Sequence, residues 1–239
     1  MSRSSFEFPP YVPVAERKKA AARLVKKLSK KGQKVNPIVI EGRAISKTFW
    51  GKSWCDNLNS YSDYENRMPR GRCYARNGSV IDLNIKAGEI IALVSGSEIY
   101  DVHIKISQVA KSTWQKIVKE CSGEISSLIE LLQGKFSKGV MEIITKPKTG
   151  LFPKKSEIKF DCSCFDHADM CKHVSAVLYG VGARLDENPE DLFLLRQANH
   201  AELIENVPVG DLSKSLEKNQ STEVVGDLSK IFGIDIVKS

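Results

Sequence analysis

The sequence has no apolar run approaching the ~20 residues that a helix needs to cross a bilayer. Its first ten residues, Met1–Pro10, include no apolar stretch of the kind that marks a secretory signal. We therefore expect a cytoplasmic protein with no membrane partner. Hydrophobic residues make up 41% of the 239 residues and charged residues 27%, which is typical of a soluble globular chain with one or two domains.

Motifs of several enzyme classes are also missing. Gly51-Lys52-Ser53 ends like a Walker loop but lacks the upstream glycine spacing, so no ATPase is indicated. No glutamate stands in the His-x-Glu arrangement of the zinc deaminases. Cys171 and His173 could form a nucleophilic pair, but metal ligation would already use both. We expect a protein that is not an enzyme and has no small-molecule substrate.

Charge is unevenly distributed along the chain. Residues 186–239 contain 11 acidic and 5 basic side chains, a net charge of −6. Residues 1–185 contain 31 basic and 18 acidic side chains, a net charge of +13. A basic body with an acidic tail favours an anionic partner for the body. A protein whose basic surface is simply solvated, and whose acidic tail covers its own body, would have the same composition.

The N-terminal part of the chain predicts a basic amphipathic helix. Apolar residues recur on one face from Ala15 to Lys31, and Gly32 then supplies a C-terminal stop. Such a basic face is either solvated or in contact with phosphate or an acidic protein. The basic face consists of Arg17, Lys18, Lys19, Arg23, Lys26, Lys27, Lys30 and Lys31.

The middle of the chain carries the clearest β signal. Asn77-Gly78 predicts a tight hairpin turn, and the alternation of apolar and polar residues from Ile81 to Ile106 predicts an antiparallel meander with one buried face. Arginine forks suit phosphate and tyrosine can stack on bases, although a solvated hairpin edge that blocks strand pairing would look the same. The candidate nucleic-acid-binding residues before the turn are Arg67, Arg70, Arg72, Tyr74 and Arg76.

Several further elements follow from local patterns. Trp50 and Trp54 lie four residues apart, as on one face of a short helix packed in the core. A repeat in the tail, Val-Gly-Asp-Leu-Ser-Lys, begins at Val209 and again at Val225. The other predicted elements are helices at 108–120, 124–133, Val174–Leu185 and Pro189–Arg196, and a short strand at Glu157–Asp161.

Three of the six cysteines gather within ten positions, which in a reducing compartment indicates a metal site rather than disulfides. The other three, Cys55, Cys73 and Cys121, are interpreted as ordinary buried thiols. The clustered residues form two close pairs, Cys162 with Cys164 and Cys171 with His173, separated by six residues.

Two such pairs can supply the four tetrahedral ligands of a zinc ion. Three thiolates and one imidazole would close the site and leave no position for substrate, so the predicted zinc is structural. The ligands are Cys162, Cys164, Cys171 and His173. Three buried cysteines beside a core histidine would be the alternative. Asp166, His167 and Asp169 lie in the intervening loop and could compete as ligands.

The pattern C-x-C-x6-C-x-H, followed by an apolar helix and by Asn188–Arg196, resembles a SWIM-type zinc finger. Phe49–Trp54 and Arg70–Gly78 are similar to blocks of prokaryotic SWIM zinc finger family proteins, so that the resemblance covers roughly Phe49 to Arg196. It implies zinc bound by the four residues above. It also implies a role near DNA transactions, because such proteins are associated with Swi/Snf-type helicase ATPases.

Together these elements predict an α+β fold, in which an antiparallel β-meander with helices is followed by a small zinc-binding strand–loop–helix module. Four segments are expected: a basic arm with an amphipathic helix at 1–35, an α+β body at 36–150, the SWIM zinc finger at 151–196 and an acidic tail at 197–239.

The leading functional hypothesis is a zinc-binding accessory protein that associates with DNA or RNA and serves as an adaptor for a Swi/Snf-type helicase ATPase. The alternative is a protein–protein interaction module with no direct nucleic-acid contact, in which the basic face meets an acidic protein.

Overall fold

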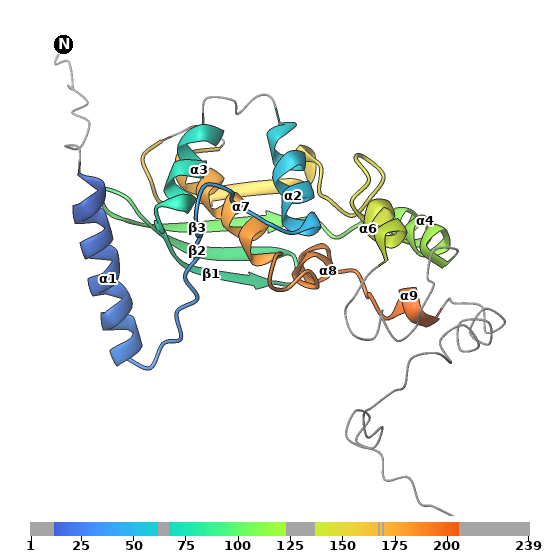
Figure 1. The fold of residues 1–239 in the computed structure, drawn as a ribbon, viewed down its shortest axis with the longest axis horizontal. Helices are drawn as coiled ribbons and strands as arrows, with labels where there is room; N and C mark the ends of the chain where they lie inside the picture. Colours follow the sequence, from blue (N-terminus) through green and yellow to red (C-terminus); the bar gives the residue numbers. More distant parts are fainter. Residues whose placement is uncertain (1–11, 62–66, 123–136, 167, 169, 206–239) are drawn as a thin grey trace, which may run out of the picture.

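The structure is a computed structural model that describes residues 12–61, 67–122, 137–166, 168 and 170–205 (Figure 1). Its strands are β1 (Val80–Lys86), β2 (Glu89–Ser95), β3 (Ile99–Ile106) and β4 (Ile158–Cys162), the last preceded by a 3₁₀ turn at Lys155–Glu157. Its helices are α1 (Val14–Lys30), α2 (Phe49–Asn59), α3 (Met68–Arg76), α4 (Lys111–Ser122), α6 (Lys138–Ile144), α7 (Lys172–Arg184), α8 (Asp191–Arg196) and α9 (Glu202–Glu205).

The strands form one antiparallel sheet in the order β1-β2-β3-β4. Leu83 lies opposite Ala92, and Ala92 lies opposite Val102. Val102 in turn lies opposite Cys162, so one row of side chains crosses the covered face and ends at a predicted metal ligand. The predicted α+β fold and the meander with one buried face are confirmed. The other face exposes Ile91, Asp101, Lys105, Lys159 and Asp161.

Helix α7 crosses the covered face of the sheet and contacts all four strands, while α2 and α3 pack against α7 (Figure 1). The helices approach closely because glycines lie where they cross. A methyl group at Gly71 would collide with the Ser175 side chain, and one at Gly51 would collide with the backbone oxygen of Gly182. The indole nitrogen of Trp54, which is fully buried as predicted, donates to the Leu178 carbonyl oxygen at 2.8 Å.

The hairpin predicted at Asn77-Gly78 is wrong, because these residues end helix α3 instead of joining two strands. Gly78 has a φ of +68°, and its N–H bonds to the Ala75 carbonyl while the Ser79 N–H bonds to that of Tyr74. This pair of bonds is the Schellman arrangement of a helix end. An Asn-Gly pair meets the same need for positive φ in a hairpin turn and at a helix end, so the local sequence does not separate the two.

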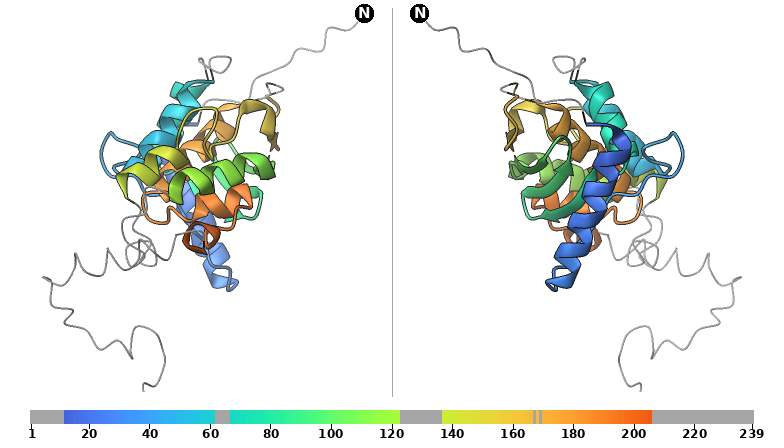
Figure 2. Two further views of the ribbon diagram at one scale, coloured as in Figure 1. Left: turned by 90° about the vertical axis from the view of Figure 1, so that its right-hand side faces the viewer. Right: turned by 90° about the vertical axis from the view of Figure 1, so that its left-hand side faces the viewer.

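The remaining helices lie at opposite ends of the sheet. Helix α1 lies at one end, and α4, α6 and α9 lie at the other (Figures 1 and 2). The predicted helices at 15–31 and 108–120 are thus found as α1 and α4, the strand at 157–161 as β4, and the two C-terminal helices as α7 and α8. The predicted helix at 124–133 and the tail repeat lie outside the described residues. None of the described helices is both long and apolar enough to span a bilayer.

A single carboxylate joins the segment before α2 to the end of α7. Asp186 accepts hydrogen bonds from the hydroxyls of Ser46 and Thr48 at 2.6 and 2.5 Å, and from the backbone N–H of Lys47 at 2.6 Å. Burial opposes the charge on Asp186, but these hydrogen bonds hold its pKa below the usual value. The ionised form is therefore favoured in the folded protein.

Stability should fall in acid partly through this group. Because the folded pKa is lowered, the contribution of Asp186 is present above the usual carboxyl pKa of about 4 and is lost as the pH falls below it. Asp186→Asn should lower the free energy of unfolding by about 1–2 kcal/mol at neutral pH and flatten the loss of stability in acid. Urea unfolding between about pH 7 and pH 3 measures both effects.

The control is Glu120→Gln, at an exposed position on α4. Its unfolding curves should follow the unsubstituted protein at each pH. The role assigned to Asp186 would be contradicted if the free energy of unfolding of Asp186→Asn fell with pH in parallel with that of the unsubstituted protein across the acid range.

Candidate metal centre

The structure brings the two predicted ligand pairs together. One possible donor atom from each of Cys162, Cys164, Cys171 and His173 lies within 4.8 Å of the others. The Nδ1 atom of His173 is 3.8 Å from the Sγ atoms of both Cys162 and Cys171. Cys171 and His173 are buried, and the other two cysteines are partly exposed. The centre lies where the end of β4 meets the beginning of α7.

Strand pairing positions the first two ligands. Cys162 is placed by its register with Val102 on β3. Ser163 then continues the pairing: its N–H donates to the Asp101 carbonyl oxygen at 3.0 Å, and its hydroxyl accepts from the Asp101 N–H at 3.0 Å. The chain is thus held on both sides of Cys162, and Cys164 follows two residues later in the bend beyond β4.

The beginning of α7 positions the other two ligands. Cys171 is the N-cap residue, and its Sγ atom accepts the N–H of Val174 at 3.4 Å. A hydrogen bond from Cys162 lowers the pKa of the Cys171 thiol, helped by His173 and by the Val174 N–H. The same contact with Cys171, together with burial, raises the pKa of Cys162. Negative charge therefore concentrates on Cys171, beside the positive end of the helix dipole.

Two tyrosines fix the orientation of the His173 ring. Tyr100 stacks on it with ring centroids 4.1 Å apart and an interplanar angle of 21°, and Tyr74 meets it edge-on at 5.5 Å. The Tyr100 hydroxyl lies 2.6 Å from the hydroxyl of Ser97. The Nε2 atom of His173 is buried and has no hydrogen-bond partner among the described residues, and a methyl group at Gly96 would lie 3.2 Å from it.

These side chains fit a metal ion. A tetrahedral site with metal–sulfur bonds of about 2.3 Å and a metal–nitrogen bond of about 2.1 Å has edges of roughly 3.6–3.8 Å. The separations of 3.8 Å between sulfur and nitrogen match those edges. A cation would also relieve the crowding of three sulfur atoms, since each can bind it as a thiolate. The cluster can therefore hold a metal ion with His173 bound through Nδ1.

The sequence did not identify the two tyrosines as neighbours of the ligand histidine. A usable signal existed for Tyr100, because it precedes Val102 by two residues and therefore faces the same side of β3. That inference also requires knowing that β4 pairs with β3, which local patterns do not reveal. Tyr74 reaches His173 only through the packing of α3 on α7, so no sequence signal could have placed it.

The candidate ligands inside the loop divide into two groups. Asp166 forms an ion pair with Arg67, with 2.9 Å between Oδ2 and Nη1, and also accepts the N–H of Ala168 at 3.3 Å. It is not part of the metal-ligand cluster. This ion pair ties the loop to the beginning of α3. His167 and Asp169 lie outside the described residues.

The five candidate nucleic-acid-binding residues lie on or next to α3, on different sides of it. Besides Arg67 at the loop, Tyr74 packs against His173, with the guanidinium of Arg17 4.7 Å from its ring centroid. Arg72 turns the other way, toward Tyr179, and the Arg76 Nε donates to the Arg72 carbonyl oxygen at 3.4 Å. Arg70 is exposed. The arginines therefore do not gather at a hairpin, although their predicted role stays a prediction.

The three cysteines outside the cluster differ in exposure. Cys121 is fully buried and Cys55 is partly buried. Cys73 is exposed, so its interpretation as a buried thiol is wrong. The reason is helical geometry: Gly71 and Ala75 face α7, and Cys73 lies between them on the opposite side of α3.

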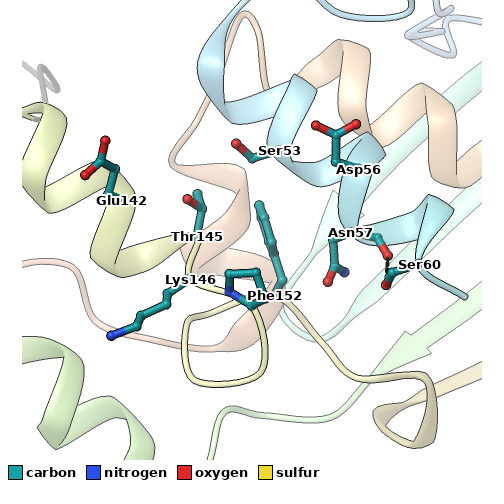
Figure 3. A pocket seen from close by; sticks show the side chains of 9 residues that line it. Ser53, Asp56, Asn57, Ser60, Glu142, Thr145, Lys146 and Phe152 are labelled. Carbon is teal, nitrogen blue, oxygen red and sulfur yellow. Dashed lines mark hydrogen bonds between the residues drawn. The ribbon is translucent and has the colours of Figure 1, made fainter.

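A pocket of about 410 Å³ lies between α2 and α6, with the buried ring of Phe152 at its base (Figure 3). Asp56 on α2 and Glu142 on α6 stand at opposite sides of it, and neither imidazole nor thiol groups line it. Two of its hydroxyl groups already donate to nearby backbone carbonyls, that of Ser60 to Asn57 and that of Thr145 to Met141. The lining of this pocket therefore offers two carboxylates but no thiol or imidazole ligand for a metal ion.

Comparisons with known proteins give one informative match. No family model and no solved structure matches the chain. The chain is 32% identical over 167 residues to a protein of Mycobacterium tuberculosis (strain ATCC 25618 / H37Rv) named "Uncharacterized protein Rv2102". The matched region covers 69% of this chain, which spans 60% of the length of that relative. The relative's name states no activity.

The stacked tyrosine should contribute to metal affinity. Tyr100→Leu removes the flat surface that orients His173 and should weaken metal binding about tenfold, the size of effect seen when groups that orient a ligand are lost. Tyr100→Phe keeps the ring and should bind within about twofold of the unsubstituted protein. Competition against a chromophoric chelator, with zinc as the probe ion, measures the affinity. Equal affinities for the two variants would contradict this role.

Proposed function

We propose that this protein is a zinc-binding accessory protein of the SWIM type that associates with nucleic acid and serves as an adaptor for a Swi/Snf-type helicase ATPase. Its zinc has a structural role. The proposal rests mainly on one observation: the basic helix α1 is linked to the metal centre through one ring, because Arg17 lies over Tyr74 and Tyr74 packs against His173.

Zinc suits the donor set better than calcium or magnesium. Three cysteine sulfurs and one imidazole nitrogen form the kind of tetrahedral site that structural zinc occupies, whereas calcium and magnesium prefer oxygen ligands. The four donors leave no open position for a substrate or a reactive water. The ion would therefore join the end of β4 to the beginning of α7, and it would do so next to the basic helix.

The surface beside the metal centre is strongly basic. Arg17 is buried between α1 and the body, where its carbonyl oxygen accepts the hydroxyl of Ser95 at 3.2 Å and its guanidinium lies over Tyr74. Lys172, at the start of α7, lies over the same ring at 5.8 Å. None of the exposed basic residues of α1 forms an ion pair with a described carboxylate: Lys18, Lys19, Arg23, Lys26, Lys27 and Lys30.

Unpaired cations on one helix favour a polyanionic partner, because phosphates can replace water and small ions around them. Arg70 is a further exposed cation, on α3. The alternative function is a protein–protein module in which the same surface binds an acidic protein. The ATPase partner rests on the resemblance to SWIM proteins, since the structure contains only this chain.

Zinc removal should loosen the junction of β4 and α7. Chelation should increase amide hydrogen exchange across residues 157–196, because three crowded thiols no longer have a shared cation. Cys171→Ser should reproduce the effect without chelator, while Cys73→Ser, at an exposed thiol on α3, should leave exchange unchanged. Hydrogen-exchange mass spectrometry measures this. The same exchange pattern before and after zinc removal would contradict a structural role for the metal.

Nucleic-acid binding should weaken steeply with salt and depend on α1. Replacing Lys19, Lys26 and Lys30 with alanine should lower affinity for single- or double-stranded DNA or RNA. The slope of log K against log salt should also become shallower by about one for each phosphate that the variant no longer neutralises. The matched control replaces Lys105 and Lys159, which are exposed on the other face of the sheet.

Fluorescence anisotropy at several salt concentrations measures affinity and slope together. The control variant should retain the affinity of the unsubstituted protein. Binding that does not respond to salt, or that both sets of substitutions weaken equally, would sink the nucleic-acid proposal. No binding at low salt, together with binding to an acidic protein surface that depends on α1, would favour the alternative.

A further inference from the structure

A second pocket, of about 360 Å³, opens between α2, α3 and the segment 43–46 that precedes α2. Arg43, Lys52 and Arg72 line it together with Tyr179 of α7. None of the four metal ligands lines it, so it is separate from the metal centre. Helices α2 and α3 both contribute lining residues, and α7 lies between them (Figure 1).

Arg72 is held in position by uncharged groups. Its Nη2 atom donates to the Asn59 side-chain oxygen and to the Tyr179 hydroxyl, each at 3.0 Å, and its guanidinium lies 5.1 Å from the Tyr179 ring centroid. The Tyr179 hydroxyl itself donates to the same Asn59 oxygen at 2.8 Å. Neither residue is a carboxylate, so these hydrogen bonds do not offset the positive charge of Arg72. Its other N–H groups, on Nε and Nη1, make no hydrogen bond to a described residue.

The rest of the pocket leaves the positive charge in excess. Arg43 and Lys52 are exposed at the rim, and neither forms an ion pair with a described carboxylate. Asp56 is the acidic residue in the lining. Burial raises the pKa of Cys55 to about 12 and raises the pKa of Tyr179 as well, so both stay uncharged at neutral pH.

The nearby carboxylate of Asp186 is engaged elsewhere. It accepts hydrogen bonds from the hydroxyls of Ser46 and Thr48 and from two backbone N–H groups of the same segment. Its lone pairs therefore do not compete for the guanidinium of Arg72. Three cations and one carboxylate in the lining leave a net charge of about +2 to be balanced by a bound anion.

We propose that this pocket binds a phosphate group, with Arg72 as its fixed cation and Lys52 and Arg43 as its flexible cations. The Nη1 group of Arg72 can donate a charge-assisted hydrogen bond to a phosphate oxygen, and the ammonium group of Lys52 adds a mobile point charge. A phosphate dianion matches the net charge of the lining. The group can come from free inorganic phosphate or from the 5′ end of a nucleic-acid strand.

The site does not depend on the nucleic-acid surface proposed above, because no residue of α1 lines it. Isothermal titration of the full-length, zinc-loaded protein with inorganic phosphate tests it. Lys52→Ala and Arg43→Ala, both at exposed positions, should each weaken phosphate binding about tenfold through loss of a charge-assisted hydrogen bond. Lys159→Ala, at the exposed face of the sheet, is the matched control and should change nothing.

Arg72→Lys tests the fixed guanidinium: it keeps the charge but loses the donor that Asn59 and Tyr179 hold in place, and should also weaken binding about tenfold. Its urea unfolding curve separates lost binding from lost folding. Two oligonucleotides of one sequence, with a 5′-phosphate or a 5′-hydroxyl, then distinguish the sources. Stronger competition by the phosphorylated strand identifies a strand end, and equal competition identifies free phosphate.

No phosphate binding at low salt, or equal affinity in the Lys52, Arg43 and Lys159 variants, would overturn the proposal. The α1 lysine variant distinguishes failure of this proposal from failure of the nucleic-acid proposal. Replacing the α1 lysines should leave inorganic phosphate affinity unchanged if the pocket is the site, whatever happens to strand binding. Loss of phosphate binding in the α1 variant would place the anion elsewhere and would also overturn the pocket.

Discussion

Helix α7 is buried along ten consecutive residues, from His173 to Gly182, and each element around it must fit its surface. The sheet lies against one side, and α2 and α3 lie against others. Close packing of this kind leaves little room for side chains where helices cross. Glycines at positions 51, 71 and 182 provide that room. The position of α7 therefore sets the positions of the helices that carry most of the candidate functional residues.

The same helix places the metal centre. Its first turn supplies Cys171 and His173, and the edge strand β4 supplies Cys162 by its pairing with β3. A metal ion at this point would cross-link the helix to the sheet between residues 11 positions apart in the chain, Cys162 and His173. Because α1 also rests on this junction through Arg17 and Tyr74, a structural metal and the basic surface share one set of contacts.

Much of the fold could be predicted from the sequence, because the patterns that indicate its strands and helices involve residues only a few positions apart. Alternation of apolar residues in β1 to β3 reflects one covered face, and the four-residue spacing of Trp50 and Trp54 reflects one buried side of a helix. The ligand set followed from spacing because two close pairs can converge with little dependence on the rest of the chain. Asn77-Gly78 failed as a guide because positive φ at a glycine serves a helix end as well as a hairpin turn.

By itself, the sequence determined the α+β class, the meander, the basic helix and the four residues that can hold a metal ion, since each depends on periodicity or on ligand spacing. Only the tertiary structure decided that β4 completes the sheet, that α3 precedes β1 as a helix, and that Tyr100 stacks on His173. It also decided that Arg67 and Arg72 have separate roles, one paired with Asp166 and the other fixed by Tyr179. The reason is that these contacts join residues far apart in the chain, and their partners are chosen by the packing of helices and strands.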